Sequence, residues 1–173
     1  AALDSPSHIR TLAAQRALLR RDKNEDVKKA LLQIFSDEKA PLKTRIASLY
    51  VISQSFPTML GFSTTQGPIG PYLVRALADV PPSEGSMITS LLIVAMSEED
   101  KPRQVLEAIV TTARLGLLEA APQIANHLSS ADPVIRHTAY RALAKMSAHE
   151  AAFSRINSDD IDTRKAAAWA LMR

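Results

Sequence analysis

The sequence contains no cysteine, which excludes disulfide bonds, thiolate metal ligands and cysteine nucleophiles. Aromatic residues make up only 5% of the 173 residues and glycine occurs 5 times, although 46% of the residues are hydrophobic. A core of alanine, leucine, isoleucine and valine favours helices in close contact, and the low glycine count argues against the many turns of a sheet protein. We therefore expect an all-α fold in a single domain that spans residues 1–173.

Long hydrophobic runs and a strong charge of one sign are also missing. No stretch approaches the ~18 apolar residues of a membrane span, and the N-terminus lacks the pattern of a signal peptide. The chain starts at Ala1 and ends at Arg173 within helical patterning, so we expect a soluble fragment of a longer protein, of undetermined compartment. The net charge of +3, from 21 basic and 18 acidic residues, is far below that of a dedicated nucleic-acid binder.

An internal repeat is the strongest positive signal. Residues 136–143 and 164–171 share Arg, Ala, Ala and Leu at an offset of 28 positions, and residues 45–52 follow the same order of residue types. Looser copies begin near Ser5 and near Val105. Small residues three and four positions apart let neighbouring helices approach closely, which predicts interhelical contacts at these positions: Ala139, Ala142, Ala167 and Ala170.

Each copy begins with residues that favour a helix start. These are Ser5-Pro6, Ala40-Pro41, Asp132-Pro133 and Ser158-Asp159-Asp160. Amphipathic second helices are expected at residues 26–35, 71–78 and 119–128. Such hairpins must stack to bury their apolar stripes, so we predict a right-handed α-solenoid of about eight or nine helices. Residues 86–96 and 103–113 form one hairpin or belong to adjacent irregular repeats.

The segment Asp132-Pro133-Val134-Ile135-Arg136, followed by Ala139 and Ala142-Leu143, resembles the Asp-Pro-x-Val-Arg opening of HEAT repeats, particularly the short bacterial kind. In that family the aspartate and arginine are structural and tie one repeat to its neighbour. The resemblance implies this role for four residues: Arg45, Asp132, Arg136 and Arg164. It covers most of the chain, but no opening motif is found between residues 56 and 102.

Residues 3–21 and 40–53 are similar to HEAT segments of large exported bacterial dehydrogenase-like proteins. Those proteins also carry a sorbosone-dehydrogenase-like propeller and a cytochrome c domain. The propeller and the Cys-x-x-Cys-His haem motif are absent from this sequence. The resemblance therefore implies no redox chemistry here, and it implies export only if the kinship holds.

Catalytic and metal-binding residues are not indicated. His137 and His149 are twelve positions apart, so one helix face does not present both to a metal, while His8 and His127 are expected at helix ends. Residues 98–100 and the aspartates 159, 160 and 162 precede or begin helices, which predicts helix capping. The glycine-rich residues 67–71 lack the ending of a phosphate-binding loop. We expect no enzyme, cofactor or metal site.

Two segments are candidates for binding. A run of basic residues near the N-terminus either meets phosphate or an acidic protein surface or, as is more common, forms a solvated helix face; it comprises Arg10, Arg16, Arg20, Arg21, Lys23, Lys28 and Lys29. Residues 53–70 are too long for a tight turn and contain apolar side chains, which either bind a partner or cover a gap in the solenoid.

The predicted function is a non-catalytic scaffold that binds another protein or neighbouring domains of its parent chain. The candidate partner-binding residues lie in the long loop and on the second helices, where their side chains are expected to point away from the apolar stripes: Lys28, Gln33, Phe56, Met59, Phe62, Arg75, Asn126 and His127. One alternative is nucleic-acid backbone binding by the basic N-terminal face, although residues 119–128 contain no lysine or arginine. Another is a bilin-lyase-like enzyme, for which no acid–base or nucleophile pairing is present.

Overall fold

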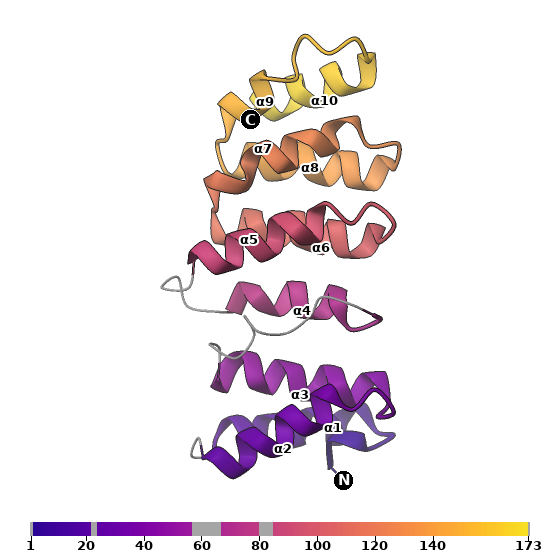
Figure 1. Ribbon diagram of the computed structural model, residues 1–173, viewed down its shortest axis with the longest axis vertical. Coiled ribbons are helices and arrows are strands. Elements are labelled where there is room, and N and C mark those ends of the chain that lie inside the picture. The colour runs from indigo at the N-terminus through magenta and orange to yellow at the C-terminus, as the bar shows by residue number, and fades with distance from the viewer. Residues whose placement is uncertain (1, 22–23, 57–66, 80–84, 173) are drawn as a thin grey trace. The chain divides into compact units, whose positions relative to one another are not determined.

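The computed structural model describes residues 2–21, 24–56, 67–79 and 85–172. These residues form ten α-helices, joined in places by short 3-10 turns, and no strand (Figure 1). The all-α helical-repeat fold is confirmed, with more helices than the eight or nine expected. The additional helix is α9, His149–Phe153, which is too short to produce a periodic sequence pattern.

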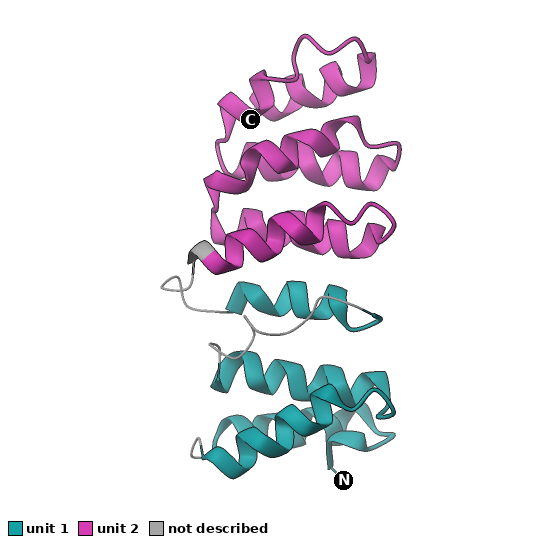
Figure 2. Ribbon diagram, in the orientation of Figure 1, with its two compact units in different colours: residues 1–84 teal, residues 85–173 magenta. Residues whose placement is uncertain are grey.

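The chain divides into two compact units, residues 1–84 and 85–173 (Figure 2). Unit 1 begins with a 3-10 turn at Ala2–Asp4 and contains α1 (His8–Leu19), α2 (Glu25–Ser36), α3 (Leu42–Ser55) and α4 (Gly70–Ala76). Helix α3 is central, because it contacts α1, α2 and α4. Its buried side chains include Leu49 and Ile52, so the core of unit 1 lies along this helix.

Unit 2 consists of three successive hairpins. The helices are α5 (Gly85–Met96), α6 (Pro102–Leu115), α7 (Ala121–Asn126), α8 (Pro133–Lys145), α9 and α10 (Ile161–Leu171). Helices α6, α8 and α10 contact one another in turn and are called layer A; α5, α7 and α9 do the same and are called layer B. Figure 1 shows the hairpins of this unit stacked one on the next.

Capping residues set the ends of the helices of layer A. Asp132 caps α8 by accepting hydrogen bonds from the amides of Val134 at 2.8 Å and Ile135 at 3.4 Å. Asp160 caps α10 in the same way, through the amides of its second and third following residues. Helix α6 ends at Gly116, whose φ of +67° is a left-handed conformation that costs glycine little.

Small side chains allow the helices of unit 2 to pack closely. The alanines expected at interhelical contacts are all buried, namely Ala139, Ala142, Ala167 and Ala170. Larger apolar side chains such as Leu92, Ile109 and Leu143 are fully buried in the core of this unit. The contacts also settle the register left open by the sequence, because α5 and α6 pack against each other as one hairpin.

Candidate functional site

The loops that precede α8 and α10 are built alike. The Nη1 atom of Arg136 donates to the carbonyl oxygen of Ser130 at 2.9 Å, and Nη1 of Arg164 donates to that of Ser158 at 2.6 Å. In each loop the serine hydroxyl also accepts from the amide of the capping aspartate two positions later. Each arginine therefore closes the loop before its own helix. Sequence reasoning placed Ser158 at a helix start but missed Ser130, although the two serines repeat at the same 28-residue offset.

Arg136 also acts on the following repeat. Hydrogen bonds from Thr163 are the main reason that the pKa of Asp160 lies below its usual value, and the positive charge of Arg136 lowers it further. The positive charge of Arg136 in α8 thus favours the charged form of the carboxylate that caps α10 in the next hairpin.

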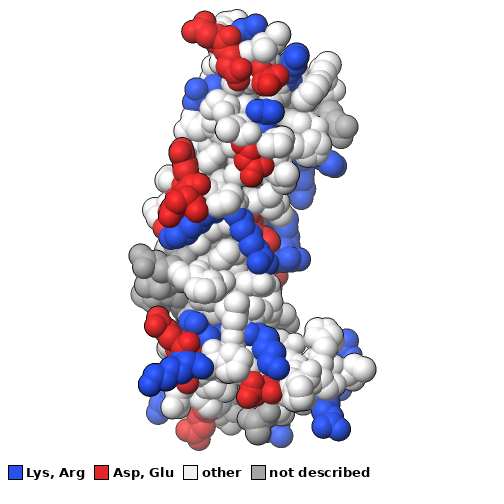
Figure 3. All heavy atoms as spheres, turned by 90° about the vertical axis from the view of Figure 1, so that its right-hand side faces the viewer, with Lys and Arg blue, Asp and Glu red and all other residues white. Residues whose placement is uncertain are grey.

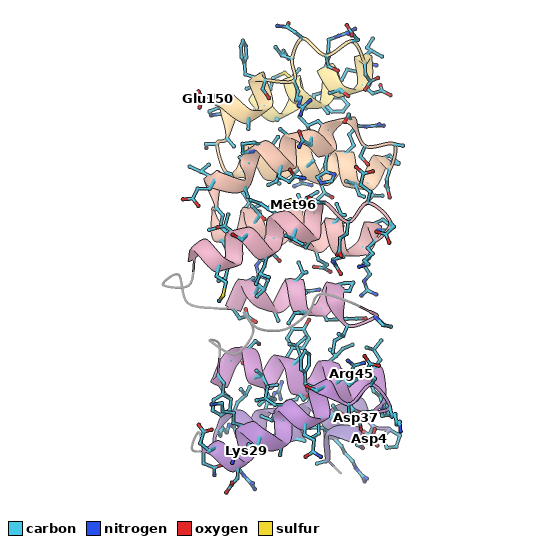
Figure 4. All side chains as sticks on the ribbon, in the orientation of Figure 1. Asp4, Lys29, Asp37, Arg45, Met96 and Glu150 are labelled. Atoms are coloured by element: carbon cyan, nitrogen blue, oxygen red, sulfur yellow. The ribbon has the colours of Figure 1, made fainter. Side chains whose placement is uncertain are left out.

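The corresponding arginine of unit 1 has a different partner. The Nε atom of Arg45 donates to the carbonyl oxygen of Phe35 at 3.0 Å, ten positions earlier, and the hydroxyl of Thr44 donates to Asp4 at 2.8 Å. Figure 4 shows Asp4, Asp37 and Arg45 at the same end of this unit. The arginine still bonds to the segment before its helix, but its partner belongs to the preceding helix α2 and not to the loop.

The acidic cluster at residues 98–100 does not cap a helix as expected. Glu98 instead accepts from the ammonium group of Lys101 at 2.8 Å and from the side-chain amide of Gln104. The residue at the N-cap of α6 is Lys101, and its side chain makes no capping bond. The expectation fails because the carboxylate reaches two polar side chains of the first turn before any free amide. For Asp160 the capping prediction is confirmed.

Charges of both signs are interspersed on the side of unit 2 that carries these loops. Figure 3 faces this side and shows acidic and basic groups intermingled, without a continuous basic field. Charge pairs such as Lys101 with Glu98 and Lys165 with Asp162 contribute to this pattern. Mixed charges of this kind offer little to a polyanion.

His127 is not on the exposed face where the sequence placed it. The short helix α7 passes into a 3-10 turn at His127–Ser129, and His127 is only 8% exposed there. Burial lowers the pKa of His127, while a hydrogen bond to the backbone of Met96 and the carboxylate of Glu99 oppose this effect. Its Nε2 atom has no hydrogen-bond partner among the described residues. The side chain therefore belongs to the interior.

The surface of layer B carries exposed apolar side chains on three consecutive elements. Val94 of α5 is 57% exposed, Leu118 before α7 is 57% exposed, and Phe153 of α9 is 63% exposed. Layer A also carries exposed apolar side chains, among them Val134 and Ile161, so exposure alone does not distinguish the two layers. We call Val94, Leu118 and Phe153 the apolar array.

Neutral polar groups and a groove accompany the apolar array. The amide of Gln123 donates to the hydroxyl of Ser97 at 3.3 Å, and that of Asn126 donates to Gln123 at 3.2 Å. Arg155 in turn donates to Asn126, so its charge is engaged within this network. A groove of about 590 Å³ between α7 and α9 is lined in part by Leu118, Gln123 and Asn126. Figure 4 shows Glu150 projecting from α9 at the edge of the unit.

The other candidate residues are dispersed. Lys28 forms an ion pair with Glu25 at 3.2 Å and keeps only 22% of its side chain exposed, whereas Gln33 and Arg75 are exposed. Phe56 is half-buried at the end of α3. Met59 and Phe62 lie outside the described residues, as does Lys23 of the basic run. All of these belong to unit 1, whereas Asn126 lies on layer B of unit 2.

A second groove lies on layer A, between α6 and α8. Its volume is about 530 Å³. The side chains that line it combine small apolar groups with three permanent cations: Val110, Ala113, Arg114, His137, Thr138, Arg141, Ala142, Ala144 and Lys145. We call it the basic groove. Sequence reasoning missed it, because its residues come from two separate helices with no shared motif.

Among the described residues, no group of three or more histidine or acidic side chains is placed to hold a metal ion. No helix in the same part of the chain has the length and apolar character needed to cross a membrane.

Comparison with known proteins supports the fold. No family model matches the sequence, and a comparison with curated proteins gives no match. Among solved structures, the chain is similar to an engineered protein whose crystal structure was determined by the Northeast Structural Genomics Consortium. The TM-score is 0.53 at 17% sequence identity, and the match covers 99% of this chain and 92% of the engineered one. At this identity the likeness shows an all-helical, repeat-like fold over the whole chain.

Proposed function

We propose that this chain is a non-catalytic protein-interaction scaffold of HEAT-like repeats that binds a partner protein through layer B of unit 2. The HEAT-like assignment is supported by the Asp-Pro opening at Asp132 and by the arginine of each loop that bonds back to a carbonyl oxygen. Stacked helical hairpins present extended surfaces on which binding residues from several repeats act together.

The observation that carries the proposal is the apolar array. Burial of the exposed Val94, Leu118 and Phe153 against a partner would be favourable, because it removes apolar surface from water. Phe153 in particular has the size and rigidity of a residue that anchors an interface. The neutral groups around them can exchange hydrogen bonds with a protein backbone or with polar side chains. The partner is accordingly a protein with a complementary apolar surface.

The charges of layer B favour a protein over a nucleic acid. The segment 118–126 contains one charged residue, Glu119, and the arginine nearest to it in the groove, Arg155, is already bonded to Asn126. A nucleic-acid backbone requires several unengaged cations. The basic residues of α1, including Arg10 and Arg16, are exposed but belong to unit 1 and are not part of this layer.

Affinity capture from a native cell extract tests the proposal. The full chain is immobilised as wild type, as the double variant Leu118→Ser/Phe153→Ser, and as the control Val134→Ser/Ile161→Ser. The control removes apolar side chains of similar exposure, 57% and 55%, from the first turns of α8 and α10 in layer A. Capture of a protein partner should persist at raised salt and should be unchanged with the control. The Leu118→Ser/Phe153→Ser variant should bind that partner at least about tenfold more weakly than wild type.

Three results would reject the proposal. The first is equal capture by both variants, and the second is recovery of nucleic acid that is lost at high salt. The third is association of the wild-type chain with itself in gel filtration that the Leu118→Ser/Phe153→Ser variant abolishes, because the apolar array would then be a contact between copies.

A further inference from the structure

The basic groove on layer A has features that the scaffold proposal does not use. Its walls come from α6 and α8, which run side by side in unit 2. The cationic groups of Arg114, Arg141 and Lys145 line it, and no carboxylate does. Helix α8 contains no acidic residue at all. Arg141 and Lys145 are exposed, and neither forms an ion pair with a described residue.

The partial negative charge at the C-terminal ends of α6 and α8 is too small to neutralise the positive charge of the groove. Arg114 and Lys145 lie in the last turns of α6 and α8, where a helix carries a partial negative charge of about half a unit. The end of α8 offsets about half a unit of charge, whereas Arg141 and Lys145 together carry two charges and form no ion pair with a described residue. Arg141 lies a turn before the end of its helix, where the effect of the helix end has already fallen off.

The floor of the groove is apolar. Ala113 and Ala142 are buried beneath it, and Val110 is partly exposed at its side. Their short side chains leave a hollow of about 530 Å³ between the longer basic side chains. This volume accommodates a few residues of a peptide, including one apolar side chain.

We propose that the basic groove binds an acidic peptide segment, in which carboxylates on either side of an apolar residue pair with Arg114, Arg141 and Lys145 while the apolar residue contacts the alanine floor. The guanidinium groups can bond both oxygens of a carboxylate, a geometry that lysine alone does not offer. A nucleic-acid backbone would engage the cations but leave the apolar floor unused. The basic groove belongs to layer A, so this site is separate from the apolar array.

Fluorescence anisotropy with short labelled peptides tests the assignment. One peptide alternates aspartate and glutamate with leucine, and a second has the same charge but serine in place of each leucine. We expect the leucine peptide to bind more tightly, and binding to weaken about tenfold or more in the variant Arg141→Glu/Lys145→Glu. The milder variant Arg141→Gln/Lys145→Gln should weaken binding by a smaller factor. The mutated residues are exposed, so circular dichroism should show an unchanged helical fold.

The control is Arg10→Glu/Arg16→Glu, which makes the same change in net charge on exposed residues of α1. This variant should bind the leucine peptide like wild type. An equal loss in the control would overturn the proposal, because the attraction would then depend on total charge alone. So would equal affinity for the two peptides, or a labelled single-stranded oligonucleotide that binds more tightly than the leucine peptide and competes with it. The Leu118→Ser/Phe153→Ser variant should bind the peptide normally, so the two proposals fail independently.

Discussion

The two units use the same type of residue in different ways. In unit 2, Arg136 and Arg164 each bond to a serine carbonyl oxygen six positions earlier. In unit 1, Arg45 bonds to a carbonyl oxygen ten positions earlier, at the end of the preceding helix. The comparison shows that an arginine in the first turn of such a helix bonds back to a carbonyl oxygen before that helix, which lies in the loop in unit 2 and in the preceding helix in unit 1.

The largest effect in this comparison is expected from the cores. Leu143→Ala in unit 2 and Leu49→Ala in unit 1 each delete a buried leucine and should lower the free energy of unfolding by about 2–5 kcal/mol. Hydrogen exchange should show that amide protection falls mainly in the unit that carries the change. A uniform fall over both units would contradict this expectation and would support one cooperative domain across residues 1–173.

Replacement of the loop arginines should have a smaller effect. Arg136→Met and Arg164→Met retain most of the aliphatic stem but lose the bond to the serine carbonyl, so each should destabilise the chain by about 1 kcal/mol. Chemical denaturation of each variant measures the loss. Both arginines bond to a serine carbonyl, but Arg164 also donates to the carbonyl oxygen of Asp159 at 3.0 Å, so Arg164→Met should be the more destabilising variant. A larger loss for Arg136→Met would contradict this expectation.

The smallest effect concerns the buried histidine of unit 2, His127, since the histidine of unit 1, His8, is exposed. The folded pKa of His127 is lowered below the ordinary value of 6.5, so the unfolded chain binds a proton more readily than the folded one. The contribution of neutral His127 is therefore complete above pH 6.5 and is lost as the pH falls towards the folded pKa. The thermal midpoint should fall between about pH 7.5 and pH 5.5.

Two substitutions check that assignment. His127→Gln should show a flatter dependence of the thermal midpoint on pH, whereas His8→Gln, at an exposed position in unit 1, should follow the wild type. An unchanged pH dependence in His127→Gln would mean that another group is responsible.

The repeat frame could be predicted because its signals are local. A capping aspartate, a proline in the first turn and small residues at helical spacing act within a few positions, and Asp132, Ala139 and Ala142 behave as their types predict. The pairing of α5 with α6 depends on contacts between helices, which no short segment encodes. Helix α9 was missed because five residues are too few to show a helical period.

The candidate surfaces were harder to predict from sequence. An apolar residue is expected to be buried, so Leu118 and Phe153 gave no sign of exposure. His127 is buried within a 3-10 turn that the helical pattern of the sequence did not predict. The basic groove combines Arg114 with Arg141, and their proximity arises only when α6 packs beside α8. In each case the missing information is tertiary.

The loops before α8 and α10 are alike, so a hairpin could be inserted between them without creating a new kind of junction. The junction made by Ser130 and Arg136 is repeated by Ser158 and Arg164, 28 positions later. A duplicate of residues 131–158, inserted after Ser158, would begin and end at junctions that the chain already forms. Each inserted hairpin would pack on both sides against a hairpin of the same type as its present neighbours. The molecule could thus grow by whole modules, and its reach could change while the chemistry of every individual repeat stayed the same.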